Sequence, residues 1–207
     1  MLKSKEDIIA IIEEDQWMME LLRTVKELNL PDWWICAGFV RSKIWDELHG
    51  FSERTRIPDI DVIYFDQTNL NESAEKRLEK ELHSRLPAIP WSVKNQARMH
   101  VINNFPPYLS SVDAISKFPE TVTALGVKLD DDDNLILTAP CGIRDVLKME
   151  VNPTPFFKEA RELTLIYEQR LKKKDWSSVW SKVTVIHPPF LIFIIFIIEI
   201  KLLVILK

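Results

Sequence analysis

The sequence predicts an α/β (α+β) fold, a small mixed sheet flanked by helices. Apolar runs rich in β-branched and aromatic residues alternate with stretches whose apolar residues recur at helical spacing. The resulting order of strand, helix, strand, helix and strand is typical of α/β organisation. The 207-residue length suits one domain with an appendage, and 46% hydrophobic with 28% charged residues is typical of a folded chain. We therefore expect one domain over residues 1–187 and an apolar tail over residues 188–207.

Apolar spacing and stop signals define the elements in the first part of the chain. Residues 5–28 carry apolar side chains at helical spacing and predict one helix, which "NLPD" ends. Residues 33–37, "WWICA", predict a buried strand ended by a glycine. Residues 39–50 predict a helix because their apolar side chains form one stripe and Gly50 supplies a C-terminal stop. Residues 59–65 predict the second strand.

Shorter elements and one long closing helix are expected in the second part of the chain. Residues 71–86 predict a mostly solvated helix with an Asn or Ser start signal. The Asp run 130–133 lacks the spaced ligands, glycine and closing glutamate of a calcium loop, so it indicates a turn. The further expected elements are strands at 91–95, 126–129 and 134–139, and helices at 96–104, 110–118, 141–151 and 155–174.

Charge and cysteine usage exclude several classes of protein. The net charge is −4, with 27 basic and 31 acidic residues, so no overall basic field favours nucleic acid as a partner. Cys36 and Cys141 stand far apart, which indicates neither a disulfide scaffold nor a zinc site. The N-terminus lacks the pattern of a signal peptide. Together these features favour a cytoplasmic protein.

The tail, residues 188–207, differs from the rest of the chain. Residues 190–198 are all apolar, and Glu199 and Lys201 then interrupt the run. A membrane-spanning helix needs about 20 mostly apolar residues, so this segment is barely long enough. A membrane anchor, a strand-like packed segment and an aberrant extension remain open, with the aberrant extension favoured. Contact with a membrane is expected only through this tail.

Two carboxylates stand at the head of the second strand, in "PDIDVIYFD". Alternate side chains of a strand share a face, so Asp59 and Asp61 would lie side by side and repel each other. A divalent cation would remove this repulsion, and hard carboxylate oxygens suit Mg²⁺, with Mn²⁺ as an alternative. Gly38, before the predicted helix, would let a phosphate approach free backbone N–H groups. This combination suits phosphoryl transfer.

The stretch "AGFVRSKIWD…PDIDVIYFD" resembles the glycine and Asp-x-Asp signature of the DNA polymerase beta-like nucleotidyltransferase superfamily. Its "G-x-V-R" part is similar to the turn of tRNA CCA-adding enzymes. The wider set, with "WSVKNQARMH", "DAISKFPETVTALGVKL" and "APCGIRDVL", looks like a bacterial nucleotidyltransferase-like family of unassigned substrate. The resemblance covers about residues 15–180. It implies a nucleotidyltransferase-like core.

The resemblance also implies roles for single residues. Gly38 and Arg41 match nucleotide-binding positions of the turn, and Asp59 and Asp61 match the metal-binding, catalytic pair. Phe39 stands where a second Gly or Ser is usual, a departure that weakens the phosphate cradle.

A third carboxylate often acts in this superfamily as the base that activates the acceptor hydroxyl. The corresponding strand, 91–95, offers Lys94 and Asn95 but no acid, so Asp113 is the candidate for this catalytic role. Arg98 is a candidate ligand of the triphosphate.

We therefore expect a magnesium-dependent nucleotidyltransferase that moves a nucleoside monophosphate from a nucleoside triphosphate to an unidentified acceptor. A small molecule, a tRNA end and a protein side chain remain open as acceptors. The alternative is a degenerate nucleotide-binding module, or a regulatory protein of the antitoxin type.

Overall fold

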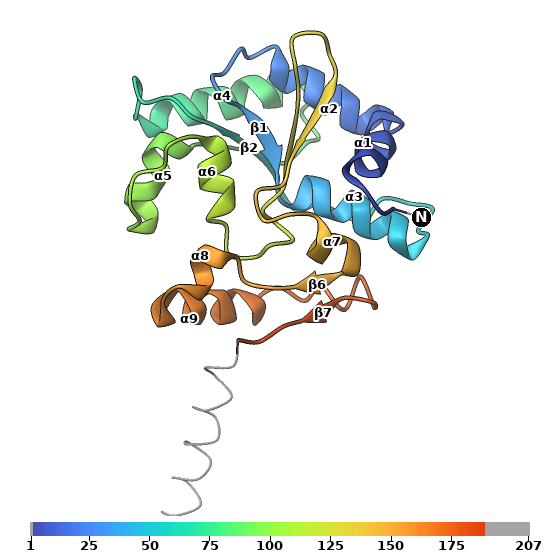
Figure 1. Ribbon diagram of the computed structural model, residues 1–207. Helices are drawn as coiled ribbons and strands as arrows, with labels where there is room; N and C mark the ends of the chain where they lie inside the picture. The colour runs from blue at the N-terminus through green and yellow to red at the C-terminus, as the bar shows by residue number, and fades with distance from the viewer. Residues whose placement is uncertain (1, 189–207) are drawn as a thin grey trace, which may run out of the picture.

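The computed structural model describes residues 2–188, which form a mixed sheet surrounded by helices (Figure 1). The helices are α1 (Lys5–Glu13), α2 (Gln16–Lys26), α3 (Gly38–His49), α4 (Glu72–Arg85), α5 (Gln96–Asn103), α6 (Ser111–Ser116), α7 (Arg144–Lys148), α8 (Pro155–Lys158) and α9 (Arg161–Leu171). The strands are β1 (Trp34–Cys36), β2 (Ile60–Tyr64), β3 (Trp91–Asn95), β4 (Gly126–Leu129), β5 (Leu135–Thr138), β6 (Glu150–Val151) and β7 (Thr184–Val185).

The main sheet has five strands in the order β3-β2-β1-β4-β5. β2 and β3 are parallel, and α4 makes the crossover between them, whereas the other neighbours are antiparallel. β6 and β7 form a separate two-stranded parallel pair. The predicted mixed sheet flanked by helices is confirmed.

One face of the sheet carries the main hydrophobic core. Ile35, Val62, Val93 and Val127 are register partners across four strands and are all fully buried. They belong to one core cluster with apolar side chains of α1, α2 and α4. Because alternate strand residues point to opposite faces, the residues next to these four in each strand point to the other face of the sheet.

The opposite face is only partly covered by apolar packing. Cys36 and Ile63 belong there to a smaller cluster that Ile115 of α6 completes. Asp61 is the register partner of Cys36 on β1 and of Ser92 on β3, so it lies on this second face. The strand that supplies core residues to one face therefore presents a carboxylate on the other.

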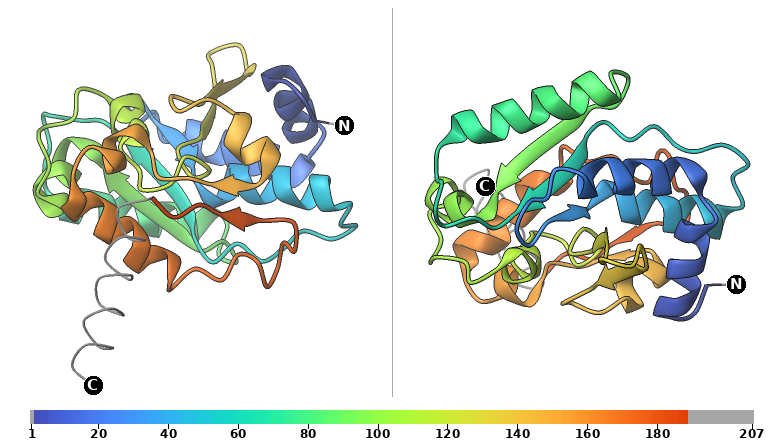
Figure 2. Two further views of the ribbon diagram at one scale, coloured as in Figure 1. Left: turned by 60° about the horizontal axis from the view of Figure 1, so that its bottom comes forward. Right: turned by 90° about the horizontal axis from the view of Figure 1, so that it is seen from above.

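The C-terminal part of the described chain returns to α3 (Figure 2). Beyond α9, Trp176 and Trp180 pack edge-on against Trp45 of α3, with ring centroids 6.0 and 5.2 Å apart. β7 then pairs with β6. Residues separated by more than 130 positions in the sequence thus form one wall of the molecule.

Two predicted long helices are each divided into two. In the range 5–28 the chain bends before α2, because the Asp15 side chain accepts from the N–H of Met18 and starts a new helix. In the range 155–174, α8 begins at a Thr154 cap and ends before α9. The helix expected over 141–151 is shorter, because its last residues form β6.

Membrane contact was expected only through the tail, of which residues 189–207 lie outside the described residues. Within residues 2–188, no helix has both the length and the apolar character required to cross a membrane. The domain boundary after residue 187 stays a prediction.

Candidate active site

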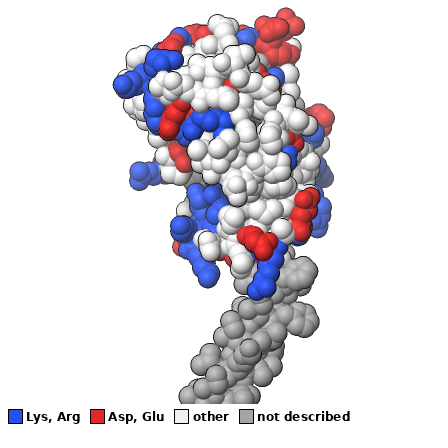
Figure 3. Space-filling model, turned by 90° about the vertical axis from the view of Figure 1, so that its left-hand side faces the viewer, with Lys and Arg blue, Asp and Glu red and all other residues white. Residues whose placement is uncertain are grey.

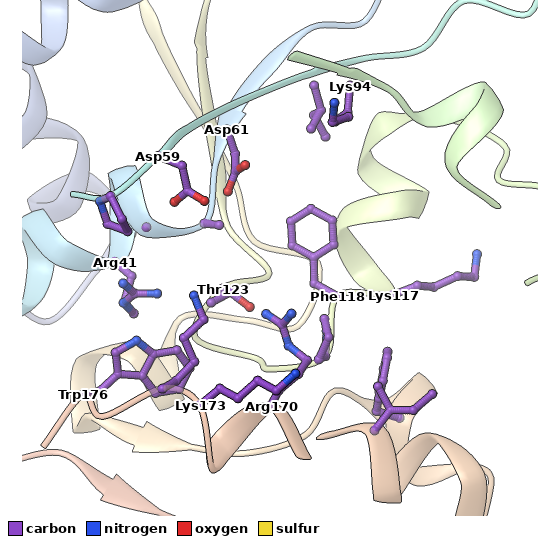
Figure 4. A pocket seen from close by; sticks show the side chains of 18 of the residues that line it. Arg41, Asp59, Asp61, Lys94, Lys117, Phe118, Thr123, Arg170, Lys173 and Trp176 are labelled. Atoms are coloured by element: carbon purple, nitrogen blue, oxygen red, sulfur yellow. The ribbon is translucent and has the colours of Figure 1, made fainter. Parts of the chain in front are cut away.

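A cavity of about 740 Å³ lies next to the partly covered sheet face. The ends of β1 and β2, the α5–α6 region and the segment around α9 contribute its walls (Figure 4). Gly38, Arg41, Asp59 and Asp61, four of the residues singled out in the sequence, all line it. Their assembly in one cavity follows from the short β1–α3 turn and from the antiparallel pairing of β1 with β2.

The two carboxylates lie at the start of β2. Asp59 directly precedes the strand and is exposed, whereas Asp61 is half-buried, and Figure 4 shows both side chains directed into the cavity. Burial, together with the neighbouring Asp59 charge, raises the pKa of Asp61 to about 6, although Lys174, Ser92 and Arg170 act in the opposite direction. The negative potential at Asp61 is therefore only partly compensated by the protein.

The donor chemistry of this pair fits a hard divalent cation. Among residues 2–188, no group of three or more His, Cys, Asp or Glu side chains is arranged to hold a metal ion. Mg²⁺, however, is commonly held by one or two carboxylates together with substrate phosphates. The raised pKa of Asp61 is the observation expected where a cation would relieve burial and repulsion.

The N-terminus of α3 opens onto the same cavity. No side chain caps the N-terminus of α3, a feature it shares with α7 and α9, whereas α1, α2, α4, α5, α6 and α8 each have a capping side chain. Ala37 at this turn has φ 54°, a strained value for a residue with a side chain. A Cβ atom added to Gly38 would lie 3.6 Å from Nη2 of Arg41, an ordinary van der Waals distance that places this guanidinium beside the turn. Uncapped N–H groups and the helix dipole favour an anion here.

Arg41 is the buried cation of the site. Its side chain, on a residue only 7% exposed, lies over the rings of Trp45, Trp176 and Trp180, with its Cζ atom 5.2, 5.0 and 5.6 Å from their centroids. Nη2 donates to Oγ of Ser42 over 3.4 Å, but Nε has no hydrogen-bond partner among the described residues. Burial lowers the pKa of Arg41 to about 10, against the attraction of the surrounding carboxylates. Arg41 stays charged at neutral pH, with an unused donor.

Sequence reasoning missed the contribution of the C-terminal segment. Arg170, Lys173, Lys174 and Trp176 all line the cavity. Arg170 donates through Nε to the fully buried Glu120 over 2.9 Å, and Lys174 lies close enough to lower the pKa of Asp61. The basic run "RLKKK" was the available signal, but a run at a helix end is usually only solvated surface.

Lys and Arg side chains also gather on the molecular surface. On the face seen in Figure 3 they are most numerous on the left-hand side, with acidic side chains among them, and others lie along the lower and right-hand edges. The net charge of −4 for the whole chain therefore conceals a local excess of positive charge.

The structure does not bring Phe39, Arg98 or Asp113 to the cavity lining. Phe39 is fully buried and packs on Trp17, with ring centroids 5.9 Å apart. Arg98 donates through Nε and Nη2 to Glu75 over 3.0 and 2.9 Å. These contacts engage the two residues in packing and in an ion pair, away from the carboxylates.

Asp113 is likewise engaged within its own helix region. Its carboxylate accepts from the N–H of Leu109 over 2.9 Å and pairs with Lys117 over 2.5 Å. Asp175, beyond α9, lines the cavity instead, and its carboxylate accepts from the N–H of Ser178. Asp175 is thus a further carboxylate on the cavity lining.

The mixed sheet, the uncapped helix N-terminus and the paired carboxylates are the features expected of a nucleotidyltransferase. A family model described as "Nucleotidyltransferase" matches residues 23–185, and the chain belongs to this family. Its resemblance to CCA-adding enzymes, predicted from the sequence, is also confirmed at the level of the fold.

Two solved structures illustrate that likeness. An NMR structure described as revealing a CCA-adding enzyme head domain is 36% identical, with a TM-score of 0.82, covering 90% of this chain and 98% of that one. An apo form of a CCA-adding enzyme is 15% identical, with a TM-score of 0.50, covering 89% of this chain and 43% of the enzyme. This second match shows the fold alone. No curated protein matches the sequence.

Proposed function

We propose that the protein is a magnesium-dependent nucleotidyltransferase, which moves a nucleoside monophosphate from a nucleoside triphosphate to an acceptor hydroxyl. One observation carries the proposal: the paired carboxylates Asp59 and Asp61 share a cavity with an uncapped helix N-terminus and the buried Arg41. The family and the fold support nucleotidyl transfer from a nucleoside triphosphate.

The residues divide into a metal-holding group and a phosphate-holding group. Asp59 and Asp61 would hold Mg²⁺, which supplies charge neutralisation on the phosphates when it is bound. The N–H groups at Gly38 and the guanidinium of Arg41, which lines the cavity, would donate to phosphate oxygens. Lys174 adds a cation beside the acids. In phosphoryl transfer the protein mainly positions groups and stabilises charge, which suits this arrangement.

A nucleotide-binding module without turnover is the second candidate. The position beside Asp61 on β3 is Ser92, which has no carboxylate to accept the proton of the acceptor. Asp113 does not line the cavity, and it pairs with Lys117, which does. Asp175 is therefore the residue whose role distinguishes the two candidates. If Asp175 accepts the proton of the acceptor hydroxyl, the protein is an enzyme; if no residue does so, the cavity binds a nucleotide without turnover.

The experiment is incubation of the protein with each labelled nucleoside triphosphate, Mg²⁺ and a cell extract, followed by a search for labelled product. We expect transfer that EDTA and Asp61→Asn abolish, and that Asp175→Asn reduces by about 100-fold or more, in the range of lost general-base catalysis. Asp113→Asn is the matched control and should retain activity. Metal-dependent nucleotide binding without product would favour the binding module, and the absence of nucleotide binding would refute both candidates.

A further inference from the structure

Asp46 of α3 is a buried carboxylate behind the cavity. The residue is 6% exposed, and it does not line the cavity. Oδ2 accepts from the N–H of Thr55 over 2.9 Å and from its hydroxyl over 3.1 Å, whereas Oδ1 accepts from Nε1 of Trp180 over 2.8 Å. Within the described part of the chain it forms no ion pair with Lys, Arg or His. Its hydrogen-bond donors are all neutral, and the charge that attracts it is the buried Arg41. A buried carboxylate is costly unless it is well compensated, so these contacts are worth a functional explanation.

One side of Asp46 holds the loop that leads to the metal-binding pair. Thr55 lies four residues before Asp59, in a loop from residue 51 to residue 59 whose side chains are mostly exposed. The loop is also attached through Phe51, whose N–H donates to the carbonyl of Asp46, and through Arg54, which donates to both carboxylate oxygens of Asp15. The two hydrogen bonds from Thr55 to the Asp46 carboxylate therefore restrict where the backbone enters β2, and with it the position of Asp59.

The other side of Asp46 holds the wall around the buried cation. Trp180 packs on Trp45 and covers Arg41, with the Arg41 Cζ atom 5.6 Å from its ring centroid. A hydrogen bond from its indole N–H fixes the in-plane rotation of the ring. Trp176 comes from the same segment and completes the wall. The position of the guanidinium thus depends on a contact more than 130 residues distant in the sequence.

We propose that Asp46 is a positioning residue that sets the metal-bearing loop and the phosphate-binding Arg41 relative to each other. This inference rests on the proposed function of the cavity. Both oxygens are needed, because one holds the loop and the other holds Trp180. An asparagine at this position has one acceptor oxygen, so it retains one of the two attachments. Its NH₂ group would face the donor of the other attachment and could not accept from it.

Three variants separate the two attachments. Thr55→Val removes the hydroxyl bond from the loop to Asp46 and leaves the backbone N–H bond. Trp180→Phe removes the indole donor while keeping an aromatic ring. Isothermal titration would measure Mg²⁺ half-saturation at fixed ATP, and ATP affinity in EDTA. We expect Thr55→Val to raise Mg²⁺ half-saturation by about tenfold, the lower range for lost supporting contacts at metal sites, with metal-free ATP affinity unchanged. Trp180→Phe should weaken metal-free ATP binding by several-fold, with Mg²⁺ half-saturation unchanged, and Asp46→Asn should change both.

A matched control exists elsewhere in the chain. Asp32 also accepts from an indole and a backbone N–H: Nε1 of Trp34 over 3.2 Å and the N–H of Ser111 over 2.6 Å, and it does not line the cavity. Asp32→Asn and Trp34→Phe should change neither ligand constant. A purely structural role for Asp46 would make Asp46→Asn and Asp32→Asn lower the unfolding temperature alike with both constants unchanged, which would overturn the inference. Wild-type protein that binds neither ATP nor Mg²⁺ would instead overturn the proposed function of the cavity.

Discussion

Two arginines on helices that directly follow strands of the sheet have opposite environments. Arg98 at the start of α5 forms a two-atom ion pair with Glu75, which is fully buried. Arg41 in α3 is itself buried, lies among three tryptophans, and has no carboxylate within ion-pair distance among the described residues. Both were candidates for a triphosphate contact, but Arg98 is engaged in an ion pair, whereas Arg41 lines the cavity.

The difference lies in where the charge is compensated. Arg98 is neutralised inside the protein by Glu75, and this ion pair holds α5 against α4. Arg41 is kept charged and incompletely hydrogen-bonded, at a cost in stability that a bound anion would offset. An arginine left unpaired at a cavity is therefore a stronger indicator of ligand binding than one in a good ion pair.

The largest expected effect is on the Arg98 side of this comparison. Arg98→Met leaves the buried Glu75 with Lys94, 3.6 Å away, and with the N–H of Asn95. It should lower the free energy of unfolding by about 3 kcal/mol, the range for breaking a buried pair. Urea denaturation would measure the change. Arg77→Met, which removes an exposed arginine of α4, is the control and should have little effect. Equal stability of Arg98→Met and wild type would contradict the assignment.

Arg41→Met should show the reverse pattern. ATP affinity should decrease by about 30-fold, equivalent to about 2 kcal/mol for a lost charged hydrogen bond. The free energy of unfolding should stay within about 1 kcal/mol of wild type, because lost stacking is offset by removal of a buried, unpartnered charge. Calorimetry and urea denaturation on the same preparation test both halves. A large stability loss with unchanged ATP affinity would make Arg41 another structural arginine.

The smallest expected effect concerns the acid beside Arg41. The pKa of Asp61 is raised in the folded protein, so between about pH 4 and pH 6 the folded state retains a proton that the unfolded state has released. Stability from this group therefore falls as pH rises through that window and is constant above it. Asp61→Asn should remove this pH dependence. Without metal, it should raise the free energy of unfolding at pH 7 by about 1 kcal/mol, which is less than the full pKa shift would give because the residue is half-buried.

Denaturation of both proteins at pH 4.5 and 7, with and without Mg²⁺, provides the measurement. Mg²⁺ at neutral pH should stabilise wild type more than Asp61→Asn. Identical pH profiles for the two proteins would show that burial and repulsion at Asp61 are weaker than inferred.

Local patterns were sufficient where a residue's neighbours in sequence decide its state. The alternation in "DIDVIYFD" predicts which side chains share a face, and pairing of β2 with β1 then places Asp61 beside the end of β1. Helical spacing located most helices but missed the break at Asp15, because that residue caps α2 and also pairs with Arg54, 39 positions away. Sequence spacing contains no information about such a contact.

The chain's own pattern thus determined the mixed sheet, the glycine turn and the adjacent carboxylates, since these depend on backbone preference and strand periodicity. Helical spacing also explains the pairing of Asp113 with Lys117, four residues further on. The tertiary structure decided how the two arginines are compensated. Arg98 acquired Glu75 of α4 as a partner, whereas Arg41 acquired tryptophans from the C-terminal segment. Electrostatic compensation depends on distance in space, and burial strengthens each interaction, so residues of the same type serve as structural anchor or as ligand site according to what folding brings beside them.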